Sequence, residues 1–199
     1  MLTSIVPKRG TPTADIRNDS GGRGRRDEID GIEVWIKGNS PTSGSSIHSP
    51  YRERAAYVLD CLLGFNLVPP TILHLIDNEL VSAQTWVTGE RPDGEKEPIE
   101  LEIFDYIIGN CDRHEGNWII GEDGEIWAID NAFAFYSCIV HKPDYDAAIP
   151  ETIKDNLREA LKYPQEIDKA LDRLISKEVI DAIISRMETI VDYGEEEAE

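Results

Sequence analysis

Cysteine is scarce in this sequence, and long apolar runs are missing. Its 199 residues include three cysteines without a Cys-x-x-Cys pair, so we expect no disulfide framework and a cytoplasmic location, which is reducing. The most apolar stretch, residues 55–70, is interrupted by Asp60 and ends in two prolines. We therefore expect no transmembrane helix, and nothing near the N-terminus is apolar enough for a secretory signal.

Basic residues are also few. The chain has 20 Lys and Arg against 39 Asp and Glu, a net charge of -19. Such a chain is repelled by nucleic-acid phosphates and by anionic lipid headgroups, so we expect neither a nucleic-acid partner nor stable membrane association. The excess of acidic residues is also compatible with a simpler function, that of an acidic interaction protein that binds a basic partner.

Hydrophobic periodicity predicts the order of the elements. Residues 32–38 alternate as a strand does, and residues 50–63 carry an apolar stripe at helical spacing that ends at Gly64. Residues 1–30 are poor in large apolar side chains and predict a flexible loop or a glycine turn between short strands. The stripe of the helix consists of Ala55, Leu59, Leu62 and Leu63.

The rest of the chain continues this alternation of strands and helices. Residues 67–77 and 79–89 predict a strand pair with a turn at Asp77-Asn78. A helix is expected within 95–110, a hairpin within 117–131 whose second strand ends in Asp130, and further helices between 151 and 192. This order predicts an α+β fold.

The densest polar segment is "GNCDRHEGNWII", residues 109–120. Alone it fits a solvated turn, a metal site or a phosphate-transfer centre. Asp112 and Asn117 lie five residues apart, and Asp130 lies 18 residues beyond Asp112, across the predicted hairpin. Converging carboxylate and amide oxygens suit Mg²⁺ or Mn²⁺ carrying substrate phosphates. In addition, Asp112 is placed to accept a proton from a hydroxyl nucleophile, so the set favours phosphate transfer.

Two upstream residues supply a candidate phosphate grip. Lys37 ends the predicted strand 32–38, and Glu53 lies in the first turns of the following helix. A Lys held by a Glu can bind phosphates in a fixed position. Each residue also has an ordinary structural explanation, because Lys is common at strand edges and Glu is favoured near a helix N-terminus.

These motifs resemble a known family. "FDYIIGNCDRHEGNWII" followed by "IWAIDNAFAF" resembles the catalytic core of the phosphatidylinositol 3-/4-kinase-like group, and more loosely that of secreted Fam20-type and HipA-type kinases. The stretches "YRERAAYVLDCLLGFNLVPPTIL" and "LVSAQTWV" are similar to small bacterial kinase-like proteins of this group. The resemblance implies a minimal two-lobed protein-kinase-like fold, with a small β-rich N-lobe and a mostly helical C-lobe.

The resemblance also implies domain boundaries. The N-lobe would span 31–88 and the C-lobe 89–193. Before them lies a poorly defined segment, 1–30, with a candidate glycine-rich loop, and after them an acidic tail, 194–199.

The same resemblance assigns roles to individual residues. Asp112 would be the catalytic Asp, Arg113 and His114 would orient its loop, and Asn117 and Asp130 would be the metal ligands. Lys37 would contact the ATP phosphates and pair with Glu53. The hinge that offers backbone groups to adenine would consist of Gln84, Thr85, Trp86 and Val87.

The sequence departs from the family pattern at several positions. No clear Gly-x-Gly-x-x-Gly precedes Lys37, and "SGGRGRR" is the nearest substitute. Trp35 would share a face with Lys37, where it would stack on the base or narrow its pocket. Asp130 is followed by Asn131 rather than by Phe-Gly.

The function expected from these features is an ATP-dependent phosphotransferase with Mg²⁺ or Mn²⁺ as cofactor. Its acceptor would be a hydroxyl of a protein or small molecule rather than of a lipid, with a basic acceptor favoured by the acidic surface. The departures support an alternative, a pseudokinase that binds nucleotide or a protein partner without catalysis.

Overall fold

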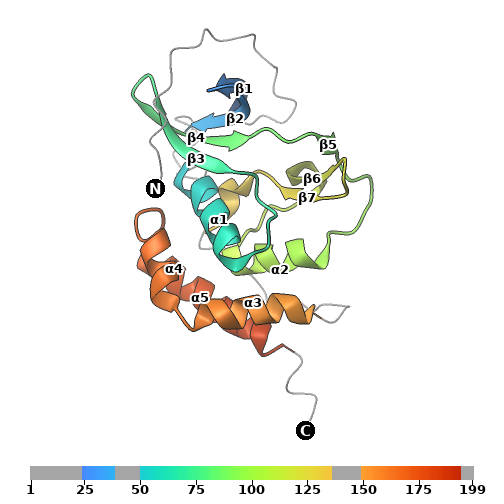
Figure 1. Ribbon diagram of the computed structural model, residues 1–199, viewed down its shortest axis with the longest axis vertical. Coiled ribbons are helices and arrows are strands. Elements are labelled where there is room, and N and C mark those ends of the chain that lie inside the picture. Colours follow the sequence, from blue (N-terminus) through green and yellow to red (C-terminus); the bar gives the residue numbers. More distant parts are fainter. Residues whose placement is uncertain (1–23, 39–49, 136–148, 194–199) are drawn as a thin grey trace.

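The computed structural model describes residues 24–38, 50–135 and 149–193. The larger sheet has four strands. Figure 1 shows it at one end of the molecule, with a smaller sheet beside it and the C-terminal helices at the other end. The predicted two-lobed α+β architecture is confirmed. Residues 1–23 and the tail 194–199 lie outside the described residues, and the boundaries predicted between lobes stay predictions.

The larger sheet is antiparallel throughout. Its strands are β1 (Gly24–Ile29), β2 (Ile32–Gly38), β3 (Thr71–Ile76) and β4 (Glu79–Thr85), in the order β1-β2-β4-β3. The predicted strand 32–38 and strand pair 67–89 are therefore confirmed. Both hairpins turn on two residues with positive φ, Asp30-Gly31 and Asp77-Asn78. Such turns match the twist of the strands they join.

Strand β1 falls in the segment 1–30, for which we expected a flexible loop or a glycine turn between short strands. Its bounds were not predicted, because Arg25, Arg26, Asp27 and Glu28 break any apolar alternation. The strand is held instead by its pairing with all of β2 up to Lys37, and by Arg26, whose Nη2 lies 2.5 Å from Glu33 Oε1 across the strand pair. The overlooked signal was Asp30-Gly31, a dipeptide typical of hairpin turns.

The two faces of this sheet have different roles. Val34 and Ile36 of β2 pack with Val81 and Ala83 of β4 in a small apolar cluster on one face. Because side chains alternate along a strand, Lys37 points to the other face. On that face it lies against the first helix, α1, and so toward the second lobe.

Helix α1 (Pro50–Leu63) joins the two lobes. Ala55, Ala56 and Leu59 belong to the main core together with the C-terminal helices, and the helix also contacts β3 and β4. Leu62 was expected in the apolar stripe, but its side chain is 43% exposed. The buried face continues to Asp60 instead, so Leu62 lies just outside it.

The polar loop 109–117 follows a helix that lies between α1 and the C-terminal helices (Figure 1). Helix α2 (Ile99–Ile108) leads into it, and a three-stranded sheet of β5 (Gly89–Glu90), β6 (Trp118–Gly121) and β7 (Ile126–Ala128) follows. Short 3-10 turns cover Glu115–Asn117 and Asn131–Phe133. The predicted hairpin is present, but its second strand ends at Ala128, two residues before Asp130.

The C-terminal helices supply eight of the 25 buried residues of the large core, and α1, α2 and the segments around them supply most of the others. The C-terminal helices are α3 (Glu151–Leu161), α4 (Pro164–Leu171) and α5 (Lys177–Val191). Helix α5 packs on α2, and Arg186 Nη1 donates to the carbonyl of Ile107 at 3.2 Å. Helices α2 and α5 therefore hold the segment that precedes the polar loop. Across the described ranges, no helix is both long and apolar enough to cross a bilayer.

Asp60 is a buried carboxylate that fixes the chain after α1. It accepts hydrogen bonds from the backbone N–H groups of Leu67 (3.0 Å) and Val68 (3.2 Å). Leu67 in turn accepts a bond from Ala128 N at 2.8 Å, which ties this segment to β7. Burial raises the pKa of Asp60 to about 6, although the two N–H donors oppose the shift.

We predict that Asp60 makes stability fall as pH rises. Because its folded pKa lies above the ordinary value of 3.8, the contribution is fully present below pH 3.8 and is lost as pH rises through about 6. Between pH 7 and pH 4, the free energy of unfolding of wild type should rise relative to that of Asp60→Asn by on the order of 2–3 kcal/mol. Urea unfolding at several pH values measures it, and a constant difference would contradict the prediction.

Candidate active site

Arg113 is the centre of the polar loop. Its side chain is only 4% exposed, and its guanidinium makes five hydrogen bonds. Two go to the carboxylate of Asp105 (2.7 and 2.9 Å), and one goes to Asn131 Oδ1 at 2.7 Å. The others go to the carbonyls of Asn117 and Ile129. Since a guanidinium has five N–H donors, all are used, and Arg113 ties α2 to the loop and to the segment after β7.

The start of the loop is organised by Asp105 of α2. Besides Arg113, its Oδ1 accepts a bond from Asn110 Nδ2 at 2.9 Å. Asn110 Oδ1 then accepts from the backbone N–H of Asp112 at 3.2 Å. Gly109, with φ 63°, ends α2 in the left-handed conformation that glycine adopts without strain. The sequence analysis did not identify Asp105, although an acidic residue inside an apolar helix is a signal for a buried partner.

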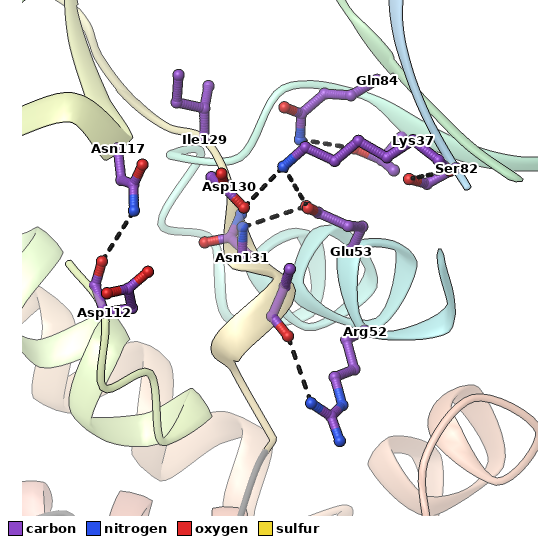
Figure 2. A network of polar contacts seen from close by, with 12 residues as sticks. Lys37, Arg52, Glu53, Ser82, Gln84, Asp112, Asn117, Ile129, Asp130 and Asn131 are labelled. Carbon is purple, nitrogen blue, oxygen red and sulfur yellow. Dashed lines mark hydrogen bonds and ion pairs between the residues drawn. The ribbon is translucent and has the colours of Figure 1, made fainter. Parts of the chain in front are cut away.

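Lys37 lies between two carboxylates. Its Nζ is 3.0 Å from Glu53 Oε1 and 2.7 Å from Asp130 Oδ1, as Figure 2 shows. Burial alone would lower the pKa of Lys37, but the charges of Glu53 and Asp130 and their hydrogen bonds raise it above its ordinary value. Lys37 is therefore held in its charged form.

Asp112 and Asn117 form the other side of the site. Figure 2 shows them across from Lys37, Glu53 and Asp130. Asn117 Nδ2 donates to the backbone carbonyl of Asp112 at 2.8 Å, so its Oδ1 points away from that loop. Asn117 is buried, whereas the side chain of Asp130 is 39% exposed. The two sides of the site thus contribute one hard oxygen donor each, the amide oxygen of Asn117 and the carboxylate of Asp130.

The backbone of Asp130 is unusual. Its φ of 54° and ψ of 60° lie in the left-handed region, which is uncommon for residues other than glycine. Ile129 N donates to the carbonyl of Asn117 at 3.0 Å, which fixes the chain just before it. The conformation turns the chain out of β7 and directs the Asp130 carboxylate to Lys37. Strained backbone of this kind persists only where surrounding contacts hold it.

His114 lies on another side of the loop. It is exposed, and its Nδ1 accepts from Gly116 N at 2.9 Å, which begins the turn Glu115–Asn117. His114 also lines a cavity of about 600 Å³ beside the loop. The predicted orienting role is thus divided: Arg113 holds the loop to the rest of the fold, while His114 holds only its local turn. The cavity is lined by Glu95, Lys96, Glu97, Glu102, His114, Glu115, Gly116 and Trp118.

The predicted hinge lies at the end of β4. Gln84 is buried, and its Nε2 donates to Thr71 Oγ1 at 3.0 Å. The backbone N–H of Thr85 donates to Pro70 and that of Trp86 to Glu33. Both donors are therefore occupied within the sheet. An adenine base at this hinge would therefore have to bind backbone carbonyl groups or Val87.

Two tryptophans stand near this hinge. Trp35 of β2 and Trp86 have ring centroids 5.8 Å apart, tilted by 45°. Arg26 lies over the Trp86 ring, 4.7 Å from its centroid. The ring of Trp35 rests against Gly24, where a Cβ atom would collide with it. Trp35 shares the face of Lys37, as predicted, so the aromatic pair borders the site.

Three comparisons with known proteins give consistent results. Residues 100–192 match the family described as phosphatidylinositol 3- and 4-kinase. The chain is 29% identical over 163 residues to phosphatidylinositol 4-kinase gamma 4 of Oryza sativa subsp. japonica, a match that covers 68% of this chain and 26% of that protein. The chain therefore spans about a quarter of the length of this curated relative.

The fold is similar to a solved structure. The crystal structure of the Helicobacter pylori proinflammatory kinase CtkA aligns with a TM-score of 0.54 at 17% identity, covering 94% of this chain and 91% of that one. At this identity the likeness concerns the fold alone. With the sequence matches, it supports a PI3/PI4-kinase-like protein.

We predict that Arg113→Met strongly destabilises the fold. Removing the guanidinium leaves the buried Asp105 carboxylate without its charged partner, which costs about 3–5 kcal/mol of unfolding free energy. Arg158→Met is the matched control: Arg158 pairs with Glu151 and Asp155 on the surface, and exposed pairs contribute about 1 kcal/mol or less. Urea unfolding compares the two, and equal losses would contradict the central role of Arg113.

Proposed function

We propose that this PI3/PI4-kinase-like protein is an ATP-dependent phosphotransferase that moves the γ-phosphate of ATP to a hydroxyl group. The observation that carries the proposal is the position of Lys37, ion-paired with Glu53 and Asp130 opposite Asp112 and Asn117. The kinase-like domain supports a phosphotransferase. The residue roles below are our assignment.

The charges around Lys37 suit a metal–nucleotide ligand. Lys37, Glu53 and Asp130 together carry one net negative charge, with the cation shared between the two carboxylates. A divalent cation would compete with Lys37 for Asp130. Lys37 would then keep Glu53 as its partner and turn its remaining N–H donors to the phosphates.

The donor set fits Mg²⁺ or Mn²⁺. Asp130 and Asn117 would hold the ion through a carboxylate and an amide oxygen, the hard ligands such ions prefer. These ions commonly use few protein ligands and complete their coordination with water and substrate phosphates. Bound there, the ion would neutralise charge on the phosphates. Within the described residues, no group of three or more His, Cys, Asp or Glu converges as a metal-binding cluster.

Asp112 would act on the acceptor. Its backbone N–H is bound by Asn110 and its carbonyl by Asn117, so the loop fixes where its carboxylate stands. It would orient the attacking hydroxyl and take its proton as oxygen bonds to the γ-phosphorus and ADP leaves. Trp35 and Trp86 would border the adenine base and offer it an aromatic surface.

The acceptor is proposed to be a protein or small-molecule hydroxyl, with a basic group nearby. The cavity beside the Asp112 loop is lined by four glutamates and one lysine. Burial and the charge of Asp105 raise the pKa of one of them, Glu97. An acidic wall attracts cationic groups and repels an anionic headgroup. The curated relative is named as a lipid kinase, so phosphatidylinositol is the acceptor to compare.

We predict that Mg²⁺·ATP stabilises the wild-type protein and not Asp130→Asn. A ligand at 100 times its Kd that binds only the folded state adds about 2.7 kcal/mol. The isosteric Asn removes the charge that would hold the ion. Asp123→Asn, in the exposed turn between β6 and β7, is the matched control and should respond like wild type. Thermal unfolding with ATP, with and without Mg²⁺, measures this; no shift in wild type would reject nucleotide binding.

We further predict that Asp112→Asn abolishes transfer but keeps nucleotide binding. Loss of a positioned proton acceptor typically lowers the rate by about 10²–10⁴-fold. Transfer of labelled phosphate from ATP is measured to basic Ser- and Thr-containing peptides and to phosphatidylinositol vesicles. Labelling of the lipid alone would overturn the acceptor class. Nucleotide binding without transfer to any acceptor would instead favour a pseudokinase, the alternative that Trp35 supports.

A further inference from the structure

We propose that Asn131 is the positioning residue that connects the Asp112 loop to the Lys37–Glu53 pair and sets the direction of Asp130. This inference deepens the proposed function and rests on it only for the metal-binding consequence. The residue follows the proposed metal ligand directly and is fully buried, with 0% of its surface exposed. Its position in the polar network is drawn in Figure 2.

Each polar group of Asn131 that faces the site makes a bond to a different element. Its Oδ1 accepts from Arg113 Nη2 at 2.7 Å, and its Nδ2 donates to the carbonyl of Ala128 at 3.3 Å. Its backbone N–H donates to Glu53 Oε2 at 3.2 Å. Glu53 is thus held on one oxygen by Asn131 and on the other by Lys37. The connection runs from the polar loop through Asn131 to α1 and β2.

The bonds require an amide at this position. Asp would keep an acceptor for Arg113 but would place a second carboxylate oxygen against the carbonyl of Ala128. A second negative charge would also lie near Glu53 and compete for the guanidinium that neutralises Asp105. Ala would leave one donor of the buried Arg113 unpaired, which is costly in a dry environment. Asn satisfies donor and acceptor with one neutral group.

Asn131 also completes the support of Asp130. The segment before Asp130 is fixed by the bonds of Ala128 N to Leu67 and of Ile129 N to Asn117. The segment after it is fixed by Asn131. Between these supports Asp130 is held in its left-handed conformation with its carboxylate toward Lys37. If the downstream support is lost, Asp130 can relax and its carboxylate no longer points toward Lys37.

The first test measures nucleotide binding by Asn131→Asp and Asn131→Ala. Removing a residue that orients a metal ligand typically weakens metal binding by about 10- to 100-fold. Calorimetry should show this loss for Mg²⁺·ATP in both variants and little change for ATP with EDTA. Lys154→Met removes another buried polar contact, to the carbonyl of Tyr193 between α3 and the end of α5, and controls for lost stability. Wild-type affinity for Mg²⁺·ATP, or equal losses with and without metal, would overturn the proposal.

The second test does not depend on nucleotide. Glu53→Gln and Arg113→Lys are introduced singly and together, first in the protein that keeps Asn131 and then in Asn131→Ala. The urea midpoints of the variants are compared within each background. Residues linked through one network act non-additively, so the two changes should be non-additive with Asn131 and additive without it. Additivity with Asn131, or non-additivity that survives its removal, would overturn the proposal. If Arg113→Lys does not fold, Asp105→Asn replaces it.

The two tests separate the two claims. If the wild type binds no nucleotide, the proposed function fails, and the urea measurements still decide whether Asn131 couples the lobes.

Discussion

The buried ion pair between Arg113 and Asp105 is the interaction on which the site depends. Isolated charges in a protein interior are strongly unfavourable, and the guanidinium is tolerated because all five of its donors are bound. Arg113 directly follows Asp112, and its partners include Asn117 and the two neighbours of Asp130, which are Ile129 and Asn131. The requirement to satisfy one buried cation therefore fixes the relative positions of the groups we assign to chemistry.

A second cationic side chain, Lys37, organises the other half of the site through a different arrangement of charges. Lys37 is only partly withdrawn from water, with 18% of its side chain exposed, and it is shared by Glu53 and Asp130. Arg113 has a fixed set of partners, whereas in our proposal an incoming cation would take Asp130 from Lys37. The first arrangement provides rigidity, and the second would let charge be rearranged when the proposed ligand binds.

The sequence was most informative where residue type and spacing both matter. Asp112, Asn117 and Asp130 were predicted from the D-R-H-x-x-N pattern and a hairpin return, and the structure places Asp112 and Asn117 in contact and Asp130 beside Lys37. Their roles stay predictions. Apolar periodicity predicted the helix 50–63 and the strand 32–38. It also predicted the strand pair within 67–89 and the hairpin within 117–131. It did not predict strand β1, because cross-strand pairing rather than apolar alternation stabilises it.

Network residues were harder to predict than ligands. Nothing local marks Asn131, whose side chain and backbone N–H bind groups that lie 3, 18 and 78 positions away in sequence. The occupied N–H groups of Thr85 and Trp86 also depend on which strands lie beside them. Such contacts depend on the tertiary arrangement, so they cannot be predicted from a single sequence without its fold.

The span of the Glu53–Asn131 bond has a consequence for how the protein folds. The β1–β2 and β3–β4 hairpins form from neighbours, and Arg113 reaches Asp105 over eight residues. The contacts of Glu53 with Asn131 and of Arg52 with Ala132 close loops of 78 and 80 residues. Closing a loop costs conformational entropy before its contacts can form, so contacts between distant residues slow folding. The groups that we assign to nucleotide binding and transfer would thus come together only once the two lobes have docked.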